Sequence, residues 1–205
     1  MTRSRYLGVM AGAASLLLLA APVWAQSDED EMETASVEVV GVEYAFVGLP
    51  TSLPAGTEVT FSNEGEEIHE IAIARIADDT TESLPELLEM GEEALASGKV
   101  VLVGEGPLVT GPGTIAEGSL LLEQEGNYVA LCFIPQGFNP EALAAAGIDL
   151  EQLCPDLDPA TMSEEAQAIM NAPPHLAAGM IQEFTVTAAG TEPGPMPEPA
   201  EEPAA

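Results

Sequence analysis

The sequence predicts an all-β sandwich that carries two helical insertions, and three observations lead to this prediction. About seven short runs of apolar or alternating residues are separated by turn residues, as in sandwich proteins. Strands and helices do not alternate in the way that builds a parallel sheet. Helix signals are instead confined to the segments 83–98 and 136–172, each of which lies between two predicted strands.

The N-terminal segment 1–25 is typical of an export signal. Arg3 and Arg5 precede the apolar run 7–21, and Val23-Trp24-Ala25 has the small-x-small pattern of a cleavage site. A cleaved signal predicts a protein of the periplasm or the extracellular space. An uncleaved membrane anchor is the alternative, because signals and anchors overlap in length.

The charge of the chain is strongly negative, with a formal net charge of −31. Removal of the signal leaves two bases, Arg75 and Lys99, against 35 acidic residues, and therefore a net charge of −33. Such a field repels nucleic acid and anionic lipid. It also opposes the compact state, so we expect the fold to be most stable where salt screens its charges.

The composition divides the chain into four parts. After the signal, residues 26–36 form an acidic lead-in that we expect to be disordered. Residues 37–189 contain the predicted strands and are long enough to form one domain with its own core. The tail 190–205 is rich in Pro and Glu and lacks core-forming residues, so we expect it to be disordered as well.

Strands are predicted wherever apolar residues alternate or run together between turn signals. The first of them contains a phase change near Val39-Val40 that suggests a bulge. In the third, His69 shares a face with the apolar Ile71 and Ile73. The predicted strands are 37–46, 57–61, 68–76, 100–103, 114–123, 126–135 and 181–187.

Three helices are predicted within the insertions. The first, over 83–97, begins with a capping box of Ser83 and Glu86 and ends before Gly98. Two shorter helices are predicted over 140–146 and 162–171. We interpret all three as elements packed against the side of the sandwich.

Four residues make up a candidate metal site: His69, Cys132, His175 and Met180. The chain has only two histidines. One lies at the start of a strand, and the other lies with Met180 just before the last strand. Two imidazoles, one thiolate and a weak axial thioether form the ligand set of a blue-copper electron-transfer site. A histidine or methionine taken alone would more often belong to the core, so the set as a whole carries this interpretation.

The same residues lie in motifs that resemble those of the cupredoxins, in particular the plastocyanin and amicyanin type and a bacterial exported cupredoxin-like group. The segment 59–63, which leads into His69, is similar to the strand and loop that carry that family's first histidine. The resemblance covers about 37–187 without the insertions. Its other two motifs are Gly126-x-Tyr128-x3-Cys132 and Pro174-His175-x4-Met180.

The resemblance implies a Greek-key sandwich with one type 1 copper bound by these four residues near one end. It also implies a monomeric electron carrier that is not an enzyme. Together with the negative charge, it implies a basic, cytochrome-like redox partner. In the family, electrons leave through the second histidine. An exposed edge of His175, flanked by Pro173, Pro174 and Leu176, is therefore the expected docking patch.

Three features depart from the family's pattern. Cys132 and His175 are separated by 42 residues rather than by a very short segment. Glu70 stands directly after the first histidine, where the family usually has an asparagine that braces the copper loop. A second cysteine, Cys154, leaves two alternatives open. One is a metal-free binding module held by a Cys132–Cys154 disulfide, and the other is a copper carrier that uses the same ligands without electron transfer.

Overall fold

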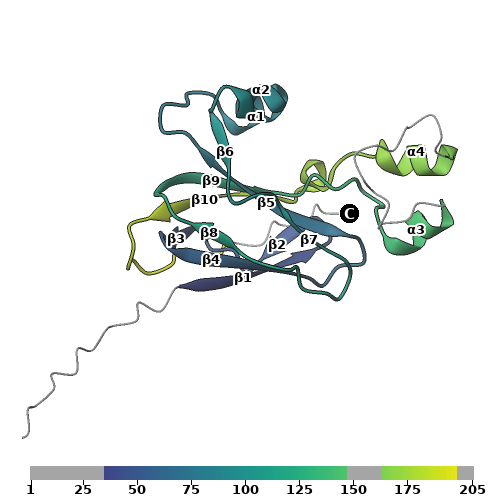
Figure 1. The fold of residues 1–205 in the computed structure, drawn as a ribbon, viewed down its shortest axis with the longest axis horizontal. Helices are drawn as coiled ribbons and strands as arrows, with labels where there is room; N and C mark the ends of the chain where they lie inside the picture. The colour runs from purple at the N-terminus through teal and green to yellow at the C-terminus, as the bar shows by residue number, and fades with distance from the viewer. Residues whose placement is uncertain (1–34, 147–162, 198–205) are drawn as a thin grey trace, which may run out of the picture. The chain divides into compact units, whose positions relative to one another are not determined.

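The computed structural model describes residues 35–146 and 163–197. The predicted export signal, most of the lead-in and Cys154 lie outside the described residues. Ten strands are described (Figure 1): β1 (Ser36–Val42), β2 (Ala45–Val47), β3 (Ser52–Pro54), β4 (Thr57–Asn63), β5 (His69–Ile76), β6 (Val100–Leu102), β7 (Leu108–Thr110), β8 (Leu120–Leu122), β9 (Gly126–Leu131) and β10 (Ile181–Thr187).

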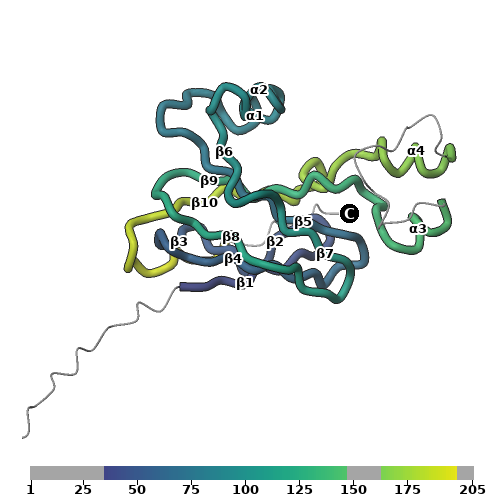
Figure 2. Tube along the Cα trace, viewed as in Figure 1, coloured from purple at the N-terminus to yellow at the C-terminus, as the bar shows by residue number. Residues whose placement is uncertain are grey.

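The strands form two sheets, which confirms the predicted β-sandwich. One sheet has the order β2-β1-β4-β8. The other has the order β3-β10-β9-β5-β6, with β7 also paired to β5. Most neighbours are antiparallel, but β1 pairs with β4, and β10 with β3, in parallel. Strands distant in sequence are therefore neighbours in both sheets, and the chain path in Figure 2 crosses between the two layers.

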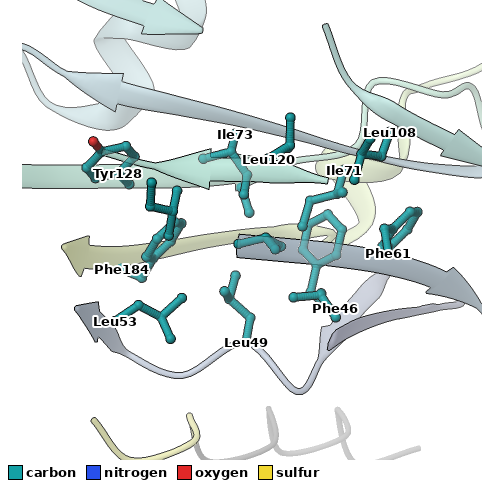
Figure 3. Packing of buried hydrophobic residues seen from close by; sticks show 14 of the residues in the cluster. Phe46, Leu49, Leu53, Phe61, Ile71, Ile73, Leu108, Leu120, Tyr128 and Phe184 are labelled. Atoms are coloured by element: carbon teal, nitrogen blue, oxygen red, sulfur yellow. The ribbon is translucent and has the colours of Figure 1, made fainter. Parts of the chain in front are cut away.

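The core lies between the two sheets and contains side chains from both (Figure 3). Phe61 of β4 is fully buried, as are Ile71 and, to 1 % exposure, Ile73 of β5. Burial of one such side chain contributes about 1.5–3 kcal/mol relative to an exposed position. His69 follows the same alternation as Ile71 and Ile73, so its side chain is directed into the core side of the sheet, as predicted.

The N-terminal strand differs from the prediction. Residues 37–46 form a hairpin of β1 and β2 rather than one bulged strand, with Val42 paired to Ala45. The hairpin turns at Tyr44, whose φ of 61° is unusual for a residue other than glycine. Short-range alternation cannot distinguish a bulge from such a tight turn. The segment 104–113, between two predicted strands, likewise contains a strand that was not predicted, β7, which pairs with β5.

The first helical insertion is two helices rather than one. The capping box is present: Glu86 accepts a hydrogen bond from the Ser83 backbone N–H at 2.7 Å. However, Gly91 has a φ of 54° and interrupts the helix, which leaves α1 (Leu84–Met90) and α2 (Glu92–Ala96). Side chains of α1 pack against Ala74, Val129 and Leu131 on the outer face of the β5–β9 sheet.

The second insertion contains α3 (Pro140–Ala145) and α4 (Glu164–Met170), close to the predicted positions. A 3-10 helix, η3 (His175–Ala178), follows α4 and leads into β10. Within the described ranges, no helix is long and apolar enough to span a membrane. At the start of the predicted tail, the Gly194 N–H donates to the Ser52 carbonyl and the Pro195 carbonyl accepts from the Thr51 N–H.

Candidate metal centre

Three of the four candidate ligands converge on one point in the protein interior. The Nδ1 atoms of His69 and His175 are 3.0 Å apart, and the Sγ of Cys132 is 3.4 Å from the His175 Nδ1. One ligand atom from each residue lies within 4.8 Å of the other two. All three side chains are fully buried.

Each of these residues is placed by a different element of the second sheet or its connections. His69 is the first residue of β5, and its loop is organised by the buried Asn63, whose side chain donates to the backbone carbonyls of Glu67 and Thr110 at 2.8 and 3.1 Å. Cys132 directly follows β9. His175 begins η3. The site therefore lies at the end of the sandwich where these three segments meet.

The 42-residue separation of Cys132 and His175 is bridged by backbone pairing at the base of the insertion. The His175 N–H donates to the Ile134 carbonyl at 2.8 Å, and the Leu176 N–H donates to the Cys132 carbonyl at 2.9 Å. Pro135 and Pro174 form an antiparallel bridge. The two ends of the insertion are thus joined as neighbouring strands would be, so the ligands have the proximity that a very short loop would give them.

The insertion also packs against the scaffold next to the first histidine. Ile68, which precedes His69, forms a small buried cluster with Phe138 and Leu143 of the insertion. The Ile68 N–H donates to the Phe138 carbonyl at 2.9 Å. This packing offsets part of the entropy cost of ordering so long a ligand loop.

Glu70 occupies the position at which the cupredoxins usually have asparagine, and it joins the two ligand segments. Its backbone N–H donates to the Cys132 Sγ at 3.4 Å, and its carboxylate accepts from the Phe133 N–H at 2.9 Å. Burial raises the pKa of this carboxyl group. Glu70 therefore makes the bracing contacts that were in doubt from the sequence.

The fourth candidate, Met180, lies beside the other three. It is fully buried. Its N–H donates to the His175 carbonyl at 3.1 Å, and its carbonyl accepts from the Cys132 N–H at 3.2 Å. The backbone of Met180 is thus bonded to two of the candidate ligands, and its side chain belongs to the core cluster that includes Cys132.

The protonation chemistry of the cluster favours a metal over a reactive thiol. Burial and the neighbouring His175 lower the pKa of His69 to about 4, so its imidazole is neutral at pH 7. Burial raises the pKa of the Cys132 thiol to about 11. A buried thiol of this kind is a poor nucleophile, whereas a bound cation deprotonates a coordinating thiol.

The donor set fits one type 1 copper. Imidazole nitrogens suit copper, a thiolate suits Cu(I), and His2Cys with a weak axial thioether is the arrangement of blue-copper sites. Cys132 is a free thiol in the structure. The proposed disulfide partner, Cys154, lies outside the described residues.

The expected exposed edge of His175 is a wrong prediction. The side chain is fully buried, and its outer nitrogen, Nε2, lies 2.8 Å from the Glu67 Oε2. The ring of Tyr44 packs edge-on against the imidazole, with ring centroids 5.2 Å apart. Glu67 and Tyr44 could not be identified from the sequence, because neither belongs to a ligand motif.

Comparisons with known proteins gave matches among solved structures only. No family model matches the chain, and no curated protein matches it. The chain is similar to auracyanin B, with 18 % identity over 75 % of this chain and 88 % of that one, at a TM-score of 0.39. It is also similar to the dithionite-reduced auracyanin of Roseiflexus castenholzii, with 19 % identity over 75 % and 97 % of the two chains, at a TM-score of 0.38.

A third match is auracyanin A, a "blue" copper protein of Chloroflexus aurantiacus, with 16 % identity over 50 % of this chain and 89 % of that one, at a TM-score of 0.32. The geometry of this chain itself resembles the cupredoxins in three respects: the sandwich, the cysteine that follows β9, and the histidine and methionine that precede β10.

Proposed function

We propose that this protein is an exported type 1 copper protein that transfers single electrons. The observation that carries the proposal is the convergence of two buried imidazole nitrogens and one buried thiol at one end of the sandwich. In this proposal His69, Cys132 and His175 are the strong ligands, and Met180 is the weak axial ligand. Export rests on the signal-like segment 1–25.

Copper, when bound, supplies a one-electron change between Cu(II) and Cu(I). The chain's own residues supply a rigid and dry environment for that change. The hydrogen bonds of Glu70 to the cysteine segment, and the backbone bonds from η3 to Cys132 and Ile134, hold the donors in place. A ligand geometry that is already ordered lets an electron move with little rearrangement.

The proposed role is that of an electron carrier rather than an enzyme. Both histidines of the chain lie in the cluster. No histidine is left to serve as the base of a serine or cysteine nucleophile, and multicopper oxidases need additional histidines. We expect the redox partner to be a basic protein, because the negative surface of this chain would attract it.

The test compares two cysteine variants of the purified protein after loading with Cu(II). We expect the parent to be intensely blue, because charge transfer from the Cys132 thiolate to Cu(II) dominates the visible spectrum of such sites. Cys132→Ser should lose the colour and most of the copper affinity. Cys154→Ser is the matched control and should keep both. A Cys132→Ser variant that binds copper as tightly as the parent would show that the thiolate assignment is wrong.

The two alternatives give different results in simple measurements. A metal-free module held by a disulfide would have no free thiols after denaturation, whereas the copper protein would have two. A copper carrier would bind copper through the same residues but would show no reversible Cu(II)/Cu(I) couple in a redox titration. Complete burial of the three donor groups opposes the role of a copper carrier, because such a protein must release its metal readily.

A further inference from the structure

A half-buried carboxylate, that of Glu67, lies against the side of the second histidine that faces away from the metal centre. The Oε2 of Glu67 is 2.8 Å from the Nε2 of His175, while the Nδ1 of the same ring is directed at His69 and Cys132. A neutral imidazole carries one proton and one lone pair. The carboxylate can only accept a hydrogen bond, so this contact places the proton on Nε2 and the lone pair on Nδ1.

Glu67 is itself held in place from several directions. Its Oε2 also accepts from the Gly137 N–H at 2.7 Å, and its Oε1 accepts from the Tyr44 hydroxyl at 3.3 Å. Its backbone carbonyl accepts from the Asn63 side chain at 2.8 Å. These partners come from the β1–β2 hairpin, from the end of β4 and from the start of the second insertion. The carboxylate is therefore fixed relative to all three segments.

The second ring completes the pattern of protons in the metal-free cluster. The His175 Nδ1 is an acceptor, so the Nδ1 of His69 at 3.0 Å must carry the proton between them. The Nε2 of His69 is then left without a proton. In agreement, it is the one buried side-chain nitrogen or oxygen among the described residues that has no hydrogen-bond partner.

We propose that Glu67 is a positioning residue that fixes the tautomer of His175 and tunes the metal centre through it. The inference rests on the copper site proposed above. A carboxylate that accepts the second N–H of a ligating histidine orients the ring and raises its basicity as a ligand. A more basic ligand stabilises Cu(II) more than Cu(I), so Glu67 lowers the reduction potential of the site.

The first measurement is made on metal-free protein, so its result does not depend on copper. Long-range proton–nitrogen NMR at pH 8 reports the tautomer of each ring, and assignment is simple because the chain has two histidines. We expect the Nε2–H form for His175 and the Nδ1–H form for His69. Glu67→Ala should leave His175 in a mixture of tautomers. A parent with His175 in the Nδ1–H form would overturn the proposal.

The second measurement compares copper-loaded Glu67→Gln with the parent. Glutamine keeps an oxygen that accepts from Nε2–H but loses the charge, so the fold should be retained. Loss of such a partner typically lowers metal affinity by about 10–100-fold. A tenfold loss confined to Cu(II) corresponds to a potential about 59 mV higher. Glu64→Gln, which removes an exposed charge from the same loop, is the matched control and should shift the potential far less.

Equal shifts of the reduction potential in Glu67→Gln and Glu64→Gln would show a general effect of charge and would overturn the proposed tuning by Glu67. A failure of the function proposed above is recognised separately. In that case the parent itself would not form a blue copper complex, while the tautomers of the metal-free protein would still test the position of Glu67.

Discussion

Glu70 lies in β5 and Cys132 directly follows the neighbouring strand β9, and the two are joined through sulfur: the Glu70 backbone N–H donates to the Cys132 Sγ at 3.4 Å. The Glu70 side chain then reaches past the cysteine and accepts from the Phe133 N–H at 2.9 Å. One residue therefore fixes both the thiol and the backbone that follows it. Glu70 thus braces the cysteine segment with a carboxylate, at the position where the cupredoxins usually have the amide of an asparagine.

Replacement of Glu70 tests this bracing role. Glu70→Ala removes the acceptor of the Phe133 N–H and should lower the free energy of unfolding by about 1–3 kcal/mol. Glu70→Gln keeps an oxygen at the same position and avoids burial of a charge, so it should remain close to the parent. Urea unfolding of the metal-free proteins measures both. Equal losses in the two variants would mean that the charge, and not the hydrogen bond, is required.

Replacement of Met180 tests the proposed axial ligand. Leucine has a similar volume, so Met180→Leu should cost less than about 1.5 kcal/mol of stability in the core. The blue colour should persist, because it arises from the cysteine. The reduction potential should rise, since the axial thioether is a weak ligand that tunes it. An unchanged potential in a redox titration would assign Met180 to the core alone.

A methyl group added at Gly65 should disturb the first histidine. A Cβ at this position would lie 2.7 Å from the His69 Nε2 and 2.5 Å from the Glu43 Oε1, so side chains would have to shift. We expect Gly65→Ala to lose about 1–3 kcal/mol of stability and part of the copper affinity. Gly106→Ala is the control, because a Cβ there meets no atom within 4 Å. Thermal melts with and without copper compare the two variants. Similar melting temperatures for Gly65→Ala and Gly106→Ala would show that the loop around Gly65 has room to adapt.

The pH dependence of the metal-free protein should report the burial of His69. Its pKa falls from 6.5 to about 4 in the folded state, because burial disfavours the charged form. The unfolded chain therefore binds this proton first as the pH falls. Stability should be complete above about pH 6.5 and decrease toward pH 4, by up to about 1.4 kcal/mol per pH unit for this one proton.

Carboxyl groups titrate in the same range, so the comparison is made with His69→Gln. The difference in unfolding free energy between parent and variant should shrink as the pH falls from 6.5 to 4. A difference that does not change with pH would show that His69 is freely protonated in the folded protein.

Salt should stabilise the protein. After removal of the signal, two bases face 35 acidic residues, and their repulsion weakens as the screening length falls from ~30 Å at 0.01 M to ~3 Å at 1 M. We expect the melting temperature to rise across this range of sodium chloride. A melting temperature that is flat or falling would mean that repulsion between the acidic residues does not limit the fold.

The sequence by itself determined much of the local structure and the candidate ligands. Alternation placed β4, β5 and β10 and directed His69 to the core side of its strand, because neighbouring side chains of a strand point to opposite faces. A capping box and a proline marked the start of α1. The presence of only two histidines, each in a matching motif, was enough to select His69, Cys132 and His175, which the structure brings together.

The tertiary structure decided what depends on contacts between distant residues. The pairing of Ile134 with His175 across the second insertion and the contact of Glu67 with the His175 ring have no periodic pattern in the sequence. Each is a hydrogen bond that becomes favourable only once the sheets have assembled. For this reason the candidate ligands could be read from the sequence, whereas the residues that hold and cover them could not.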